Sequence, residues 1–358
     1  MNPVSQRLLS QQLASPQFKD PAEVVSWFGA MQAQDYKAMR WAVSMRTRKP
    51  SGKAFEKAFN DGRIIRTHLQ RTTWQLIAGE DLGWMLDLCR PKALTGLRGW
   101  MHSNGVDIPL KEEQKISAIF AEVMAGKGSV QKEFLAEALR ERDIDMVEQR
   151  FSYHLRLAEY SGLLCAGDLH PTKRTFRLVS EKVRNPLNLS REESLALLTR
   201  KYFRSHGPAT EEDFAWWSGL GLLDCRQGIA SLGDELLTER WKKREFYIHR
   251  DARTRGFRSG SVLFLPPFDE YLIGYKSRDV VLHPDRSHHA HNQSGIFYPI
   301  VALDGEIVGN WSPSALKSGI KLFKDVSLPE EQVQKQWEAY RVVVGSTSSP
   351  TTGKLIRP

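Results

Sequence analysis

The chain has 358 residues, of which 41% are hydrophobic and 26% charged, and its formal net charge is +9. This composition excludes a collagenous, fibrous or globally disordered protein, and the length predicts two or three domains rather than one core. The basic balance favours a nucleic-acid partner without establishing one. The apolar runs 261–267 and 297–303 are too short to span a bilayer, and residues 1–12 lack the apolar core of a signal peptide. We therefore expect a cytoplasmic protein that does not enter a membrane.

Cysteine and histidine residues give little sign of metal or redox chemistry. Cys89, Cys165 and Cys225 lie far apart, which predicts three reduced, mostly buried thiols. His288, His289 and His291 cluster in a predicted loop, which we interpret as a solvated turn rather than a metal site. We expect neither a metal nor a cofactor.

Residues 1–108 predict helices followed by a β-ribbon. Helices are expected over 3–15, 21–31, 36–45 and 52–60, and the alternating β-branched and aromatic residues of 64–77 favour strands. The second of these helices begins with an Asp-Pro-x-Glu capping pattern. Three helices and then a β-ribbon is the layout of a winged helix.

The same order of elements recurs twice. Within 109–188, helices are expected over 113–124, 131–140 and 148–162, followed by strands at 164–165 and 175–179. Within 189–258, capping boxes at Ser190 and Thr210 open two helices, 224–233 is a third, and 246–249 is a strand. We interpret the three layouts as tandem winged-helix units.

Residues 259–358 are rich in strand signals. Strands are expected at 262–266, 271–273, 280–282, 296–303 and 306–311, with further candidates at 320–323 and 341–344. The Asp-Gly pair at 304–305 predicts a hairpin, 329–340 an amphipathic helix, and 346–358 a polar tail. The whole chain is thus expected to be an α+β protein.

Several short stretches resemble a known family when taken together and in order. They are MQAQD at 31–35, RTH at 66–68 with RTTWQ at 71–75, YFRSHGPAT at 202–210 with FAWW at 214–217, and LPPFDEYL at 265–272 with Arg278. From about residue 7 to 344, the chain resembles the winged-helix DNA-binding domain family whose characterised members are AlkZ-type DNA glycosylases. The resemblance implies three winged helices around a DNA channel, a small C-terminal β-barrel, and excision of N7-alkylated purines, bulky adducts or interstrand crosslinks.

The resemblance also implies a catalytic Gln-x-Gln motif, here Gln32 and Gln34. On one continuous helix these side chains would point about 200° apart, whereas in an extended segment they point the same way. A shared role therefore requires the helix to break, and we then expect the two amides to converge and hold a water. The alternative is a polar turn between helices.

The chemistry of the implied reaction suits such weakly polar groups. An N7-alkylated purine is cationic and leaves as a neutral base, so the protein needs mainly to position water and to tolerate a cationic transition state. Asp35 is a second candidate, either as a catalytic carboxylate or as a helix N-cap. Gln75 stands where many family members have His, a position that either assists catalysis or only packs and contacts phosphate.

Two basic stretches are candidate DNA contacts. Arg63, Arg66, His68 and Arg71 lie on the predicted ribbon, where they contact phosphates or form a solvated face. The densest basic stretch is expected to follow the DNA backbone or probe a groove, and it comprises Lys242, Lys243, Arg244, Arg250, Arg253, Arg255 and Arg258. Asp269 is expected to orient an arginine, to lie near the channel, or to be a turn residue.

Two functions from different classes fit these features. The first is a monofunctional DNA glycosylase acting on damaged duplex DNA, and the second is a non-catalytic winged-helix protein of transcription-factor or architectural type. A nuclease would need clustered carboxylates for metal, and the sequence offers no convincing set. Because no heptad or dimer helix is evident, we expect a monomer.

Overall fold

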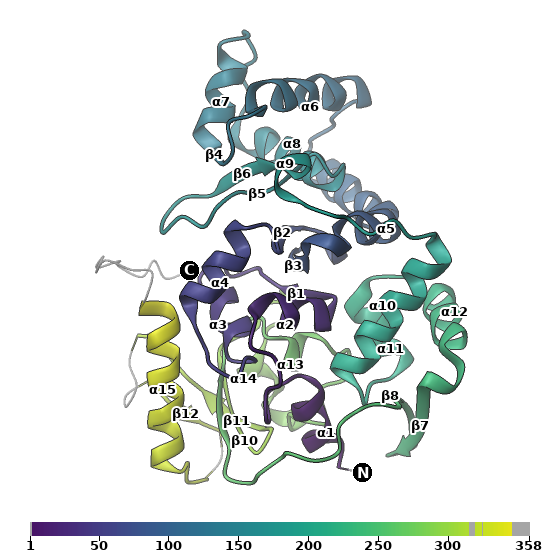
Figure 1. The fold of residues 1–358 in the computed structure, drawn as a ribbon, viewed down its shortest axis with the longest axis vertical. Coiled ribbons are helices and arrows are strands. Elements are labelled where there is room, and N and C mark those ends of the chain that lie inside the picture. The colour runs from purple at the N-terminus through teal and green to yellow at the C-terminus, as the bar shows by residue number, and fades with distance from the viewer. Residues whose placement is uncertain (1, 315–318, 324, 346–358) are drawn as a thin grey trace.

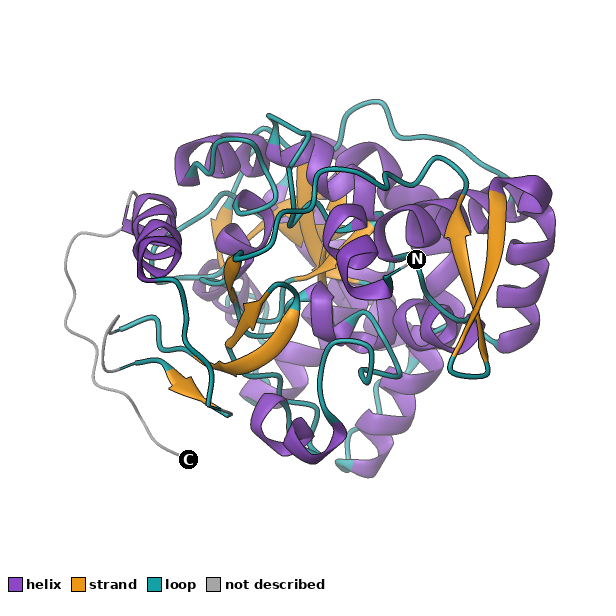
Figure 2. Cartoon of the chain, turned by 90° about the horizontal axis from the view of Figure 1, so that it is seen from below, coloured by secondary structure: helices purple, strands orange, loops and turns teal. Residues whose placement is uncertain are grey.

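The computed structural model describes residues 2–314, 319–323 and 325–345, so the polar tail expected at 346–358 lies outside the described residues. The fold mixes helices with four small sheets (Figure 1). Figure 2 shows helices surrounding most of the strands, with the two-stranded hairpin β7–β8 standing at one edge. Among the described residues, none of the helices is both long and apolar enough to cross a bilayer.

The first part of the chain contains four helices and a three-stranded sheet of order β1-β3-β2. Its elements are α1 (Pro3–Ser10), α2 (Pro21–Phe28), β1 (Ala30–Gln32), α3 (Met39–Ser44), α4 (Gly52–Asn60), β2 (Ile64–His68) and β3 (Trp74–Ala78). The expected capping box at the start of α2 is present. The prediction that this helix reaches Met31 is wrong, because α2 ends at Phe28. Gly29, at φ +80, ends the helix and lets the chain extend into β1.

A long helix, α5 (Leu82–Ser103), leads to the second part of the chain, at the upper end of Figure 1. This part contains α6 (Leu110–Met124), β4 (Val130–Gln131), α7 (Lys132–Arg140), α8 (Glu148–Tyr160), β5 (Leu164–Ala166), β6 (Thr175–Leu178) and α9 (Val179–Lys182). Its strands pair in the order β4-β6-β5, and it has a hydrophobic core made only of residues between Ile116 and Leu178.

The third part contains α10 (Arg191–His206), α11 (Glu211–Ser218), α12 (Leu222–Leu232), β7 (Leu236–Trp241) and β8 (Arg244–His249). Both capping boxes expected from the sequence are formed, at Ser190 and at Thr210. Strand β7 was not expected, because its middle residues are mostly exposed and polar, and it pairs only with β8.

The C-terminal part contains β9 (Val262–Leu265), α13 (Glu270–Ile273), α14 (Ser287–Ala290), β10 (Ile300–Leu303), β11 (Glu306–Asn310), β12 (Lys321–Leu322) and α15 (Glu330–Gly345). Its antiparallel sheet has the linear order β12-β11-β10-β9, so the expected closed barrel is not confirmed. Helix α15 packs against β9 and α3.

Three strand predictions in this part are wrong. Residues 271–273 lie in α13, because Asp269 caps a helical turn by accepting from the backbone N–H of Tyr271. Residues 280–282 form turns rather than a strand. Residues 341–344 continue α15, because burying one face of the helix places Val343 in the core and overrides the β propensity of its valines.

A buried ion pair joins α3 to the start of α13. The guanidinium of Arg46 binds both carboxylate oxygens of Asp269, at 2.8 and 2.9 Å, and its remaining N–H groups reach Ala42 O and two oxygens of Gln11. Both charged side chains are almost fully buried. All five donors of the guanidinium are therefore used, and Asp269 orients an arginine, as one of its expected roles required.

We predict that Asp269→Ala destabilises the protein by about 3–5 kcal/mol, because it leaves a buried guanidinium without its counter-charge. The measurement is the free energy of unfolding in urea. As a matched control, Arg90→Ala breaks the exposed pair with Asp87 and should leave the urea midpoint almost unchanged. An Asp269→Ala midpoint equal to that of the wild type would contradict this assignment.

Candidate functional site

Gln32 lies at the end of β1, in extended backbone, so the break expected at the Gln-x-Gln segment is present. Its side chain is buried, and its Nε2 donates to the hydroxyl of Thr73 at 3.0 Å. Gln75, on the neighbouring strand β3, donates to the same hydroxyl at 3.0 Å. Gln32 and Gln75 thus meet at one hydroxyl, a contact that was not expected from the sequence.

Gln34 lies next to this pair and is exposed to solvent. Its side-chain oxygen accepts from the backbone N–H of Trp74 at 3.4 Å, beside Thr73 in the chain. Asp35 accepts from the backbone N–H groups of Lys37 and Ala38, both at 2.9 Å, so it caps the turn that leads into α3. Three glutamine amides therefore gather around Thr73 and Trp74.

Several buried oxygens in this region have no protein hydrogen-bond donor. Gln32 and Gln75 are cross-strand neighbours, and Gln75 is also paired with Thr67 on β2. The side-chain oxygens Gln32 Oε1, Gln75 Oε1 and Thr67 Oγ1 are all buried without a partner. Unpaired buried acceptors cost about 1–3 kcal/mol each, so such a row across one small sheet is characteristic of a functional site.

The turn that presents Thr73 has unusual backbone geometry. Arg71 and Thr72 have φ values of +51 and +60, and the Thr73 N–H donates to Gln70 O at 3.0 Å. A β-branched residue at positive φ is a genuine outlier, and such strain is often found where a side chain must be aimed. Arg71 stacks over Trp216 at 5.1 Å, with its Nε buried and unpaired, and burial lowers its pKa.

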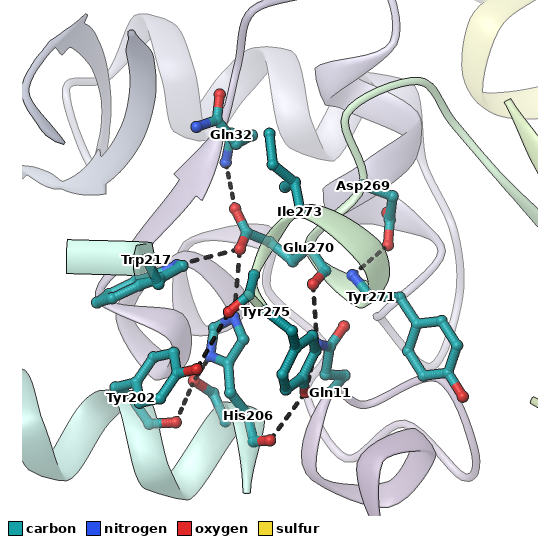
Figure 3. Close-up of polar contacts among 12 residues, drawn as sticks. Gln11, Gln32, Tyr202, His206, Trp217, Asp269, Glu270, Tyr271, Ile273 and Tyr275 are labelled. Atoms are coloured by element: carbon teal, nitrogen blue, oxygen red, sulfur yellow. Dashed lines mark hydrogen bonds and ion pairs between the residues drawn. The ribbon is translucent and has the colours of Figure 1, made fainter. Parts of the chain in front are cut away.

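Glu270 fixes the other side of Gln32 (Figure 3). One carboxylate oxygen accepts from the backbone N–H of Gln32 at 2.6 Å, and the other accepts from Trp217 Nε1 at 3.1 Å and pairs with His206 Nε2 at 3.2 Å. Glu270 is 2% exposed. Its carboxylate therefore links β1 to α10, α11 and α13 without contact with solvent.

The side chain of His206, which contacts this carboxylate, is tightly packed. The ring of Tyr202 stacks on the imidazole at 4.6 Å, and Tyr275 donates its hydroxyl to His206 O at 2.8 Å. A Cβ on Gly274 would lie 2.7 Å from the imidazole, so the approach of α13 requires glycine there. Burial lowers the pKa of His206, while Glu270 acts in the opposite direction.

The ribbon residues expected to contact phosphates differ in exposure. Arg66 and His68 are buried, with Arg66 donating twice to Ala33 O and His68 paired with Glu159. Arg63 is exposed and forms an ion pair with Asp20. Neither Arg66 nor His68 therefore forms a solvated ribbon face.

The second basic stretch lies in the turn between β7 and β8, in β8, and in the loop after β8. Lys242 and Lys243 form the exposed turn of the hairpin, both at positive φ. Arg244 is held by Asp279 at 2.8 Å, and Arg253 donates to Ser15 O at 2.9 Å. Arg250, Arg255 and Arg258 are exposed. Within the part of the chain that is described, no group of three or more His, Cys, Asp or Glu side chains is placed to hold a metal ion.

Sequence reasoning missed Thr73 and Glu270. Thr73 lies in the family-like stretch RTTWQ and Glu270 in LPPFDEYL, so the resemblance marked both segments without marking these residues. His206 and Trp217, which bind Glu270, lie in the two family-like stretches between them. The stretches MQAQD, YFRSHGPAT and FAWW therefore all contact the buried carboxylate that LPPFDEYL supplies.

The buried histidines predict how stability depends on pH. Burial lowers the pKa of His68, His154 and His206 below the usual 6.5, so each stays neutral in the folded protein when the unfolded chain takes up a proton. The free energy of unfolding should therefore fall as the pH drops below about 6.5, by up to about 1.4 kcal/mol per pH unit for each histidine. Denaturation at pH 7.5, 6.5 and 5.5 measures this, and His154→Gln should make the fall shallower. Higher stability at pH 5.5 than at 7.5 would contradict it.

Comparisons with known proteins match this chain to DNA glycosylases. Residues 25–332 match the family model described as DNA glycosylase AlkZ-like. An interstrand DNA cross-link repair glycosylase from Streptomyces sahachiroi is 23% identical over 343 residues, covering 92% of both chains. The structure of Streptomyces sahachiroi DNA glycosylase AlkZ matches with a TM-score of 0.79 and 21% identity, covering 96% of both chains.

The family match spans most of the chain, and the structural match shows the same overall fold. The family match confirms the family expected from the sequence, and together with the curated relative it favours the glycosylase over the non-catalytic DNA-binding protein. The chain belongs to the AlkZ-like family of DNA glycosylases.

Proposed function

We propose that this DNA glycosylase hydrolyses the N-glycosidic bond of N7-alkylated purines in duplex DNA, with Gln32 and Gln34 as its catalytic residues. The three helix-and-sheet units act as winged helices that hold the duplex, and the enzyme works as a monomer in the cytoplasm. The cross-link repair activity in the name of the Streptomyces relative makes an interstrand crosslink a second substrate to test.

The observation that carries this proposal is the group of amides around Thr73. Gln32 and Gln75 share its hydroxyl, while their unpaired oxygens remain able to accept hydrogen bonds. Amide oxygens can hold a water and face a positively charged sugar without being protonated. Gln34, exposed beside them, is the amide that reaches the incoming nucleotide.

No strong general acid is needed in this reaction. The alkylated purine carries a positive charge before the bond breaks and departs as a neutral base, so its nitrogen requires no proton. The water that attacks C1′ gives its proton to solvent or to a neighbouring acceptor as the new C–O bond forms. The task of the protein is orientation, which Thr73 on one side and Glu270 on the other supply to Gln32.

DNA affinity in this proposal comes mainly from phosphate contacts. The β7–β8 turn with Lys242 and Lys243 is the natural wing of the third unit, and Arg250, Arg255 and Arg258 lie exposed along the loop that follows. Such contacts carry no sequence information, so binding to undamaged duplex should be weak, sequence-independent and strongly salt-dependent.

The direct test uses purified protein and duplex carrying one N7-methylguanine, in EDTA, with abasic sites as the readout. We predict that Gln32→Ala or Gln34→Ala lowers the excision rate roughly 100-fold, the scale of losing one positioned charge-stabilising or proton-handling group. DNA affinity should stay unchanged, and Gln34→Ala should not change the melting temperature because Gln34 is exposed. Gln114→Ala, on an exposed face of α6, is the matched control. Full activity of the double Ala variant would refute the catalytic assignment.

Thr73 provides an independent test of the amide arrangement. Its backbone is extended, at φ −108 and ψ 159, so Thr73→Val fits the backbone and removes the shared hydroxyl together with its donation to Gln70 O at 3.0 Å. We predict that Thr73→Val lowers excision about 10- to 100-fold, as loss of a group that orients reacting residues does, while Thr73→Ser retains activity. Equal rates for the Val and Ser variants would show that the hydroxyl does not orient the glutamines.

A further inference from the structure

A cavity of about 110 Å³ lies between the first and second parts of the chain. Arg66, His68 and Trp74 line it from β2 and β3, Arg156 and Glu159 line it from α8, and Arg174 lines it from the loop before β6. Strand β5 and helix α8 pack directly on β2 here, as Figure 1 shows for the upper part of the molecule. This cavity is separate from the amides at Thr73, although Trp74 and Arg66 touch the neighbouring Gln34 and Ala33.

The charge on the lining is strongly positive. Three guanidinium groups face one carboxylate, that of Glu159, and burial lowers the pKa of His68, which favours its neutral form. The excess of positive charge is therefore two. The groups also repel one another: after burial, the charge of Arg174 contributes to lowering the pKa of Arg66 to about 10, and Arg156 helps to lower that of Arg174.

Two of the three arginines have no polar partner among the described residues. Arg174 stacks over Trp74 at 4.0 Å, and Arg156 lies over Trp100 at 5.0 Å and over Tyr153 at 5.8 Å, but neither guanidinium makes a hydrogen bond or an ion pair with any described side chain or backbone group. Each guanidinium offers five donors in a planar fork, a geometry suited to the oxygens of a phosphate. Arg174 is exposed and Arg156 half-buried, so both are open to a ligand from solvent, and converging positive charges without protein partners favour an anion there.

We propose that this cavity holds one phosphate group of the DNA backbone, a role that rests on the proposed function only in that duplex DNA is the ligand. The cationic purine itself would be repelled by three guanidiniums. A phosphate bound here would fix the backbone beside Gln34, with the first part of the chain holding it through Arg66 and the second part through Arg156 and Arg174.

The test is the salt dependence of binding to undamaged duplex, measured by fluorescence anisotropy on the full chain. For Arg156→Ala/Arg174→Ala, we expect weaker binding to every duplex sequence. The slope of log K against log salt should become shallower by about 0.9, the value for one lost phosphate contact. Arg174→Lys should keep the wild-type slope because it keeps the charge, yet bind less tightly because it lacks the fork. The control is Arg140→Ala, in the same part of the chain but outside the cavity, which should bind as the wild type does.

Folding and ligand source are checked separately. Because Arg156 and Arg174 hold no hydrogen bonds, the double variant should melt near the wild-type temperature. A wild-type salt slope in the folded double variant would overturn the proposal. The source of the phosphate is checked with inorganic phosphate. If it raises the melting temperature of the wild type but not of the double variant, while the salt slope is the same for both, the cavity binds free phosphate rather than DNA and the proposal is overturned. Since these measurements use undamaged DNA, they stand even where excision of N7-methylguanine fails.

Discussion

One buried carboxylate determines how the parts of this molecule fit together. Glu270 can be buried only because three donors from distant segments meet it: the backbone of Gln32, Trp217 and His206. An unpaired carboxylate in the same place would cost several kcal/mol, so β1, α10 and α11 must all be in position at once. The C-terminal part of the chain thereby fixes a strand near the N-terminus, and Arg46–Asp269 repeats that connection one residue away.

This dependence explains why β1 can be so short and still hold the side chain of Gln32 in place. A three-residue edge strand pairs on one side only, with β3, and would fray if its outer N–H faced water. Glu270 takes that outer N–H, while Thr73 takes the side-chain amide. Gln32 is therefore restrained at its backbone and at its tip by groups 238 and 41 residues away in sequence.

Local sequence patterns predicted those parts of the structure that local physics decides. The capping boxes at Asp20, Ser190 and Thr210, the helix 52–60 and the interruption of the helical pattern at the Gln-x-Gln segment were predicted because cap chemistry and a broken apolar period act over a few residues. The pairing of Gln32 with Gln75, the role of Glu270 and the partners of Arg66 could not be predicted, because each joins segments far apart in the chain. Residues 271–273 and 341–344 read as strands because valine and tyrosine favour strands, whereas the cap at Asp269 and the packing of Val343 decided otherwise.

Charge is divided across the small sheet that carries the glutamines. The carboxylate of Glu270 lies beyond β1, whereas Arg66 lies on β2 and the guanidiniums of Arg156 and Arg174 lie beyond it. A glycosidic bond that breaks with positive charge on the sugar is favoured near the first and opposed near the second, whereas the phosphodiester that carries the sugar has the reverse preference. Strand β3, which carries Trp74, lies between β1 and β2. In the proposed mode of binding, the sugar therefore faces Gln32 and the phosphate faces the arginines. An orientation set by opposite charges on the two edges of one rigid sheet requires no contact with the bases, which suits an enzyme that must act on a lesion in any sequence.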